Sequence, residues 1–319
     1  SISQEPLFEE VPYIRFIERS TGNIYDIATD EATAIRITNT TIPRIEEAFF
    51  AEEGTAAIVR YIENSTGKVQ SWYGKIIPSA EMLSRLSGNF LEEDITTLTV
   101  APDTQQIFYM RDIGDQTYGY TATPSGENVH QIFDSSFSEW IAEWTRPEEI
   151  TLTAKASGYL EGYSYALSAS GGLFKRVLGP IFGLTRLADS TGAYSLFSYS
   201  TARGMQLKVL DEVTGSYLEL PTTVLPEKCV WSKQTDAFYC AVPATTDLRV
   251  YPDDWYQGLY FSSDTLWRMD ASTGVGSFIA DLSKEGGEPV DAISLGLTKD
   301  ESFLYFINKR DNMLWGFSL

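Results

Sequence analysis

The stretch Ala57-Ile58-Val59-Arg60-Tyr61-Ile62 decides the fold of this chain. It is a short run of β-branched and aromatic residues between turn residues, which is typical of a strand buried in a sheet. Six other segments have the same character. The seven segments are 13–17, 57–62, 107–110, 150–153, 195–199, 238–242 and 304–307. Their starts lie 44, 50, 43, 45, 43 and 66 residues apart, so the chain repeats one structural unit.

A second strand-like segment follows each of the seven. These segments are 24–27, 71–74, 118–120, 163–166, 207–210, 266–269 and 314–317. Turns such as Ser20-Thr21-Gly22 and Ser272-Thr273-Gly274 stand where hairpins need them. No stretch has a strong helical period. A four-stranded unit of about 40–45 residues is the period of a propeller blade. The sequence therefore predicts an all-β, seven-bladed β-propeller of four-stranded antiparallel blades.

We assign the 319 residues to a single domain, 1–319, with blades at about 5–40, 44–93, 95–134, 138–178, 181–222, 227–282 and 290–319. The last unit has three strands before Leu319. Residues 1–4 are therefore expected to supply its fourth strand, so that the N- and C-termini close the ring. Six and eight blades are the alternatives, because the fourth strands give the weakest pattern.

The composition of the chain excludes several classes of partner and of catalytic site. The chain has 24 basic and 44 acidic residues, a net charge of −20, which argues against nucleic acid and favours basic or neutral partners. The single histidine, His130, excludes histidine-rich metal sites and is expected on an outer strand. No nucleophile elbow, P-loop or dinucleotide motif occurs, so we assign no catalytic residue and no cofactor.

The turns after the first strands resemble those of TolB-like propellers, which read roughly apolar-Trp-Ser-Pro-Asp-Gly. The matching stretches are Phe50-Ala51-Glu52-Glu53-Gly54, Val100-Ala101-Pro102-Asp103, Val230-Trp231-Ser232-Lys233-Gln234-Thr235-Asp236 and Leu297-Thr298-Lys299-Asp300-Glu301. The resemblance covers most of the chain and implies an exported propeller with a binding or scaffolding role in the cell envelope. The chain has no run of 18–20 apolar residues. It begins at Ser1, so a signal peptide or membrane anchor upstream stays open.

The widest gap between repeats is explained by an insertion at 243–263. It carries the aromatic residues and adjacent carboxylates expected of a binding loop: Tyr251, Asp253, Asp254, Trp255, Tyr256 and Tyr260. We assign these residues to ligand or partner binding. The alternative is a loop that folds down on its own side chains and packs against the neighbouring blade.

Cys229 and Cys240 flank a hairpin whose register pairs Val230 with Tyr239 and Trp231 with Phe238. The two cysteines would then face each other at a distance suited to a disulfide. A disulfide is expected in an exported protein. Two small buried hydrophobic residues are the alternative.

Charged residues near the starts of the first strands are expected to ring the mouth of the central channel. They are Glu46, Glu47, Asp94, Glu139, Arg186, Lys228 and Asp291. Such a mouth is suited to a small polar ligand or Ca²⁺, and solvated rim charge is the alternative.

The prediction is a non-enzymatic, extracytoplasmic binding or scaffold propeller of the periplasm or cell surface, with a protein partner or a glycan. Two alternatives stay open. One is an enzyme that acts on glycosides through carboxylates at the channel mouth, and the other is an architectural subunit of a larger envelope assembly.

Overall fold

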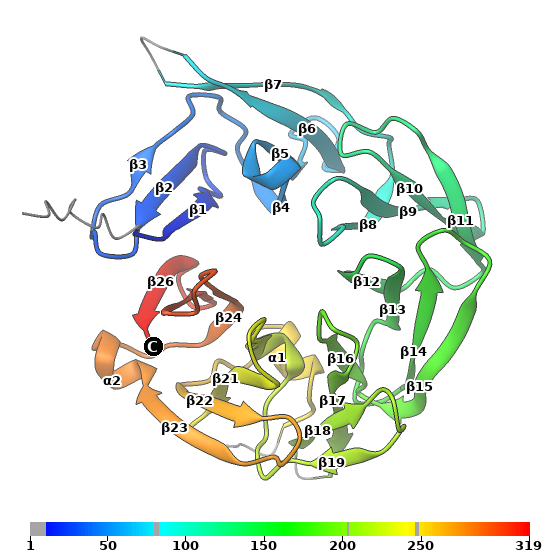
Figure 1. The fold of residues 1–319 in the computed structure, drawn as a ribbon. Coiled ribbons are helices and arrows are strands. Elements are labelled where there is room, and N and C mark those ends of the chain that lie inside the picture. The colour runs from blue at the N-terminus through cyan, green and yellow to red at the C-terminus, as the bar shows by residue number, and fades with distance from the viewer. Residues whose placement is uncertain (1–10, 80–82, 203, 246–248) are drawn as a thin grey trace, which may run out of the picture.

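A computed structural model describes residues 11–79, 83–202, 204–245 and 249–319. Seven antiparallel sheets follow one another along the chain and stand around a central channel (Figure 1). The predicted seven-bladed β-propeller is confirmed. In blades 2 to 7 the first strand lies innermost, so its side chains contribute to the channel wall (Figure 1).

The first three blades span the N-terminal part of the chain. Their strands are β1 (Tyr13–Ile17), β2 (Ile24–Ala28) and β3 (Ile35–Arg36) in blade 1; β4 (Ile45–Ala51), β5 (Ala56–Ile62), β6 (Val69–Ile77) and β7 (Arg85–Phe90) in blade 2; and β8 (Ile95–Val100), β9 (Ile107–Ile113), β10 (Gln116–Ala122) and β11 (His130–Ser135) in blade 3. A 3₁₀ turn, η1 (Glu52–Gly54), joins β4 to β5.

Blades 4 and 5 each have four strands. These are β12 (Trp140–Arg146), β13 (Glu149–Ala154), β14 (Glu161–Ser168) and β15 (Phe174–Phe182), then β16 (Thr185–Ala188), β17 (Tyr194–Thr201), β18 (Gly204–Asp211) and β19 (Tyr217–Glu219).

Blades 6 and 7 complete the ring and carry the short helices. Their elements are η2 (Pro226–Lys228), β20 (Cys229–Trp231), β21 (Ala237–Pro243), α1 (Asp253–Tyr256), β22 (Asp264–Asp270), β23 (Gly276–Asp281) and α2 (Leu282–Gly286), then β24 (Ala292–Leu297), β25 (Phe303–Asn308) and β26 (Met313–Ser318). The seven predicted repeat segments are β1, β5, β9, β13, β17, β21 and β25.

Successive residues of these strands are buried in different blade interfaces. Ile107 and Tyr109 of β9 belong to a cluster with blade 2, whereas Phe108 and Met110 belong to a cluster with blade 4. Both faces of the strand are therefore buried away from water. This explains why its sequence is continuously apolar instead of alternating between apolar and polar residues. The same division occurs in β5 and β21.

Blades 7 and 1 meet at the seam of the ring (Figure 1). A cavity of about 210 Å³ lies between them, lined by residues that include Ile14, Ile27, Phe303 and Trp315. The expected closing strand, residues 1–4, lies outside the described residues.

The predicted hairpin register of blade 6 is confirmed: Cys229 pairs with Cys240, Val230 with Tyr239 and Trp231 with Phe238. The two cysteine Sγ atoms are 2.01 Å apart, as in a disulfide, and their Cα atoms are 4.1 Å apart. Both cysteines are buried in the interface between blades 5 and 6. Within the described ranges, no helix is long and apolar enough to cross a membrane.

We predict that Cys229→Ala/Cys240→Ala lowers the free energy of unfolding by about 2–3 kcal/mol, because the bridge closes only a short loop. The propeller is retained, since its blade interfaces do not depend on the bridge. Urea unfolding followed by circular dichroism measures the change, with reduced wild-type protein as the matched control. Loss of the folded state in the variant would contradict this prediction.

Candidate binding site in the central channel

The insertion between β21 and β22 turns inward, so that α1 lies within the ring (Figure 1). Tyr251 is 3% exposed and Trp255 is 5% exposed, whereas Tyr256 is 38% exposed. The loop therefore does not present its aromatic residues as one flat outer surface. Tyr260 packs against the Tyr251 ring with its centroid 6.0 Å away.

The two adjacent carboxylates of the insertion accept hydrogen bonds from backbone amides and from one hydroxyl group. Asp253 accepts hydrogen bonds from Ser157 Oγ at 2.8 Å and from the Gly158 amide at 2.6 Å. Asp254 accepts one from the Val250 amide at 3.2 Å. The two Asp253 bonds fix α1 against the connection between β13 and β14, whereas the Asp254 bond lies within the insertion.

A buried lysine anchors the other side of α1. Lys228, which is 1% exposed, forms ion pairs with Asp264 (2.8 Å) and with Asp291. The Trp255 indole donates to Asp291 Oδ2 at 3.0 Å. Lys309 lies 3.6 Å from the Trp255 ring centroid and donates to the Trp255 carbonyl. The insertion is thus connected to blades 6 and 7 through charged groups with little access to water.

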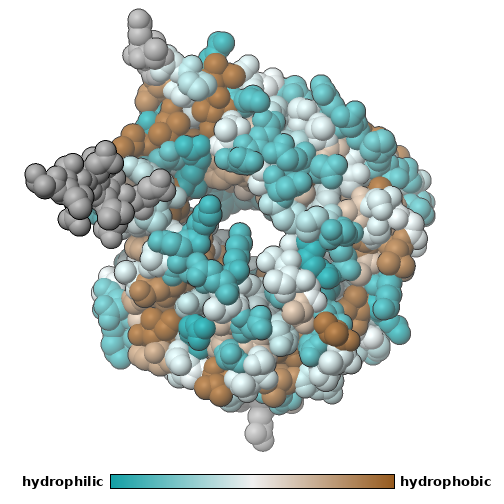
Figure 2. Space-filling view, viewed as in Figure 1, coloured by the Kyte–Doolittle hydropathy of each residue, from teal (hydrophilic) through white to brown (hydrophobic). Residues whose placement is uncertain are grey.

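Beneath α1 lies a cavity of about 640 Å³, which we call the insertion cavity. The charged and aromatic side chains that line it include Glu143 on β12, Arg186 on β16, Glu227 on η2, and Trp255 and Tyr256 on α1. The space-filling view shows an open hole at the centre of the ring, rimmed mainly by hydrophilic residues (Figure 2). A site in the channel is therefore reachable from solvent.

Glu143 is the unusual group in the insertion cavity. Its Oε2 atom is buried and has no hydrogen-bond partner among the described residues. Burial raises the pKa of Glu143 to about 7, and the negative charge of Glu227 adds to this effect while Arg186 opposes it. Burial also raises the pKa of Glu227, although Tyr256 donates a hydrogen bond to that carboxylate.

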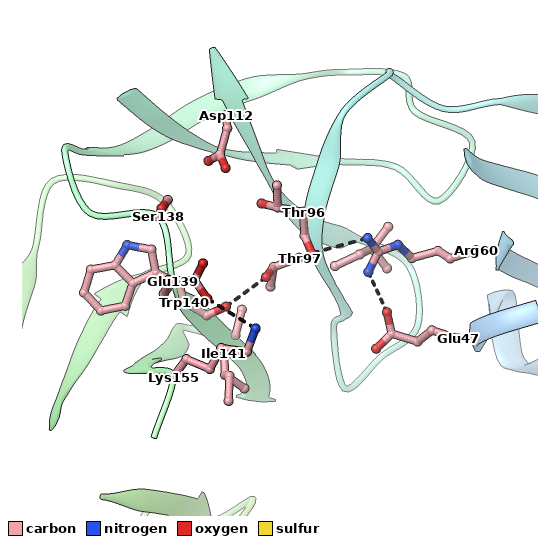
Figure 3. A pocket seen from close by; sticks show the side chains of 12 residues that line it. Glu47, Arg60, Thr96, Thr97, Asp112, Ser138, Glu139, Trp140, Ile141 and Lys155 are labelled. Atoms are coloured by element: carbon pink, nitrogen blue, oxygen red, sulfur yellow. Dashed lines mark hydrogen bonds and ion pairs between the residues drawn. The ribbon is translucent and has the colours of Figure 1, made fainter. Parts of the chain in front are cut away.

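A second cavity of about 390 Å³ adjoins the first, and we call it the Arg60 cavity (Figure 3). The two cavities share four lining residues, Glu47, Ile141, Ala142 and Lys155. Arg60 pairs with Glu47 at 2.6 Å, and Lys155 pairs with Glu139 at 3.2 Å. Charged side chains thus occur on the channel wall from blade 2 to blade 6, among apolar residues such as Ile141 and Leu184.

The charged residues predicted to ring the channel mouth do not all line the channel. Glu139 lines the Arg60 cavity and Arg186 lines the insertion cavity. Lys228 and Asp291 are buried behind the wall in the ion pair described above.

Two other predicted mouth residues pair elsewhere: Glu46 with Arg19 at 3.6 Å and Asp94 with Lys68 at 3.0 Å. His130 begins β11, an outer strand as predicted.

Sequence reasoning missed Glu143 and Glu227. Glu143 had a signal, since it is an isolated carboxylate within the apolar run Trp140-Ile141-Ala142-Glu143-Trp144. Glu227 stands beside Lys228 and had no separate signal. Among the described residues, no group of three or more His, Cys, Asp or Glu side chains is placed to hold a metal ion.

No family model matches the sequence, and no curated protein matches it. Solved structures do match its fold. A protein of unknown function from Desulfotomaculum acetoxidans is 11% identical, with a TM-score of 0.61 over 97% of this chain and 92% of that one.

An oligogalacturonate lyase from Vibrio parahaemolyticus is 8% identical, with a TM-score of 0.59 over 96% of this chain and 90% of that one. TolB from Acinetobacter baumannii is 13% identical, with a TM-score of 0.52 over 83% of this chain and 62% of that one. The resemblance to TolB-like propellers is thus confirmed as a likeness of fold. The fold is shared by a lyase as well as by TolB.

We predict that Lys228→Met lowers the free energy of unfolding by about 3–5 kcal/mol, because Asp264 and Asp291 would stay buried without a cation. Adding Asp264→Asn and Asp291→Asn should recover much of the loss, since the uncompensated charges are then removed. Urea titrations of the single and triple variants at pH 7.5 measure this. Equal stability of Lys228→Met and wild type would show that the lysine does not neutralise the pair.

Proposed function

We propose that this chain is a non-enzymatic binding propeller that takes a basic segment of a partner protein into its central channel. One observation carries the proposal: the charges that line the two cavities are unbalanced. All three basic side chains are already paired, Arg60 with Glu47, Lys155 with Glu139 and Arg186 with Glu212. In the part of the chain that the structure describes, Asp112, Glu143 and Glu227 line the cavities without a basic partner.

The size and chemistry of the channel support the same function. Cavities of roughly 300–1,000 Å³ are typical of binding sites, and the insertion cavity has about 640 Å³. The net charge of −20 attracts basic partners over a longer range and speeds their association. A Lys or Arg side chain that enters the channel would be guided by the overall charge and held by the unpaired carboxylates.

The location outside the cytoplasm is supported by the cysteine pair. A structural disulfide persists in oxidising compartments and is rare in the cytosol. The two cysteines of the chain, Cys229 and Cys240, are paired with each other in a disulfide across the β20–β21 hairpin.

The test is calorimetric titration with three short peptides of equal length, one rich in Lys and Arg, one in Gln and one in Glu. The basic peptide should bind, and Glu143→Gln/Glu227→Gln should weaken it at least tenfold. Glu285→Gln/Glu288→Gln, at exposed positions in α2 and just after it, removes the same net charge and should leave binding unchanged. Equal losses in both double variants would attribute binding to net charge alone and contradict a channel site.

A second candidate function, glycoside hydrolysis, is favoured by one specific observation. Glu143 and Glu227 line the same cavity, and burial raises the pKa of Glu143 to about 7, a value suited to a general acid. In such a reaction Glu143 gives its proton to the leaving oxygen as the glycosidic bond breaks. Water adds to the anomeric carbon and loses a proton to Glu227.

Incubation with chromogenic glycosides tests this alternative. An enzyme should show turnover that falls by at least a hundredfold in Glu143→Gln, with Glu285→Gln as the unchanged control. Absence of turnover together with peptide binding supports the binding module.

A further inference from the structure

We propose that Glu143 and Glu227 form a receptor for one organic cation, an alkylammonium or guanidinium group, and that this cation binds in exchange for a proton. The inference rests on the channel function proposed above and narrows it to one subsite and one chemical class of ligand.

The geometry of Glu143 leaves room for such a group. The carboxylate lines the insertion cavity, and its Oε2 atom is buried without a hydrogen-bond partner within the described ranges. A buried polar atom without a partner costs about 1–3 kcal/mol, more if it is charged. A ligand N–H donor that enters the cavity would remove this cost.

Glu227 lines the same cavity from η2 of blade 6, two blades further along the ring. One of its oxygens, Oε1, accepts the Tyr256 hydroxyl. The negative charge of Glu227 raises the pKa of Glu143, so the two carboxylates interact across the cavity. Two carboxylates at one cavity thus offer acceptors to a single cation between them.

The basic groups around the pair are already engaged. Arg186 is paired with Glu212, and Lys228 is held by Asp264 and Asp291. Lys309 donates to the Trp255 carbonyl, and burial lowers the pKa of Lys309 to about 8. In the described part of the chain, no ion pair joins Glu143 or Glu227 to a basic side chain.

The groups that face Glu143 also include Tyr256, the Ala188 backbone amide and, along the cavity wall, Glu47 and Lys155. Glu47 and Lys155 have partners of their own, Arg60 and Glu139. Arg186 lowers the pKa of Glu143, and Lys309 and Lys228 lower the pKa of Glu227. None of these three basic side chains forms an ion pair with either carboxylate in the described part of the chain.

The chemistry favours an organic cation over a metal ion. Ca²⁺ requires six to eight oxygen ligands, and no group of three or more suitable side chains occurs among the described residues. An ammonium or guanidinium group needs only a few hydrogen-bond acceptors and gains from aromatic neighbours. Tyr256, which is partly exposed, and Trp255 supply such neighbours in the same cavity.

The proton exchange follows from burial of Glu143, which raises its pKa to about 7. Below pH 7 the carboxyl holds a proton that an incoming cation must displace. Affinity should therefore rise as the pH increases through 7 and then level off. For a single group the dissociation constant is expected to be roughly 25-fold larger at pH 5.5 than at pH 7.5.

The experiment is calorimetric titration with n-butylammonium and agmatine at pH 5.5, 6.5 and 7.5, with n-butanol as the neutral control. At pH 6.5, titrations in buffers of different ionisation enthalpy should show release of about 0.8 proton per cation. Glu143→Gln should abolish proton release and the pH dependence. Glu227→Gln should move the midpoint below pH 7, because the neighbouring charge is removed. Glu285→Gln should behave as wild type.

The outcomes separate this inference from the proposed function. Binding of a basic peptide without proton release, or unchanged cation binding by Glu143→Gln, overturns the receptor while the binding propeller stands. Cation binding with proton release but no peptide binding supports the receptor and removes the peptide partner. Equal binding of n-butanol overturns the receptor, because it shows an apolar pocket.

Discussion

Burial of one strand on both of its faces is the constraint on which this molecule depends. In β9, Phe108 and Met110 pack toward blade 4 while Ile107 and Tyr109 pack toward blade 2. Such a strand cannot be stable in an isolated sheet, because at least one apolar face would meet water. Arranging seven sheets radially gives every such strand two neighbours. This arrangement directs the first strands toward the axis, where side chains meet a channel instead of another blade.

The channel is suited to ligand binding because its wall carries charged side chains, whereas the interfaces between blades are apolar and exclude water. Charges that the blades cannot bury are gathered around the axis, and most are neutralised in pairs such as Arg60 with Glu47. The insertion also shapes the channel. It covers part of the channel with α1 and is held there by the buried Lys228 network. The ion pair thus has a positional role, since it sets where Trp255 and Tyr256 stand relative to Glu143.

The sequence was sufficient for the features that depend on local pattern. Continuous apolar runs placed the strands β5, β9 and β21, and the register of the hairpin placed Cys229 opposite Cys240. It was not sufficient for features that depend on how distant segments meet. Glu143 and Glu227 are 84 residues apart and come together only because the ring brings blades 4 and 6 to one channel. Likewise, the aromatic content of the insertion does not reveal that Trp255 turns inward, because its partner Asp291 belongs to another blade.

Among the described residues, the interfaces between blades are not packed equally. Large clusters of buried side chains join blade 2 to blade 3, blade 3 to blade 4 and blade 6 to blade 7. Between blades 7 and 1, Ile14 and Trp315 border a cavity of about 210 Å³. Atoms that face a void lose the dispersion contacts that a filled interface provides. The described side chains at the seam therefore gain less packing energy than those of the other three interfaces, and the cohesion of the ring is unevenly distributed around its circumference.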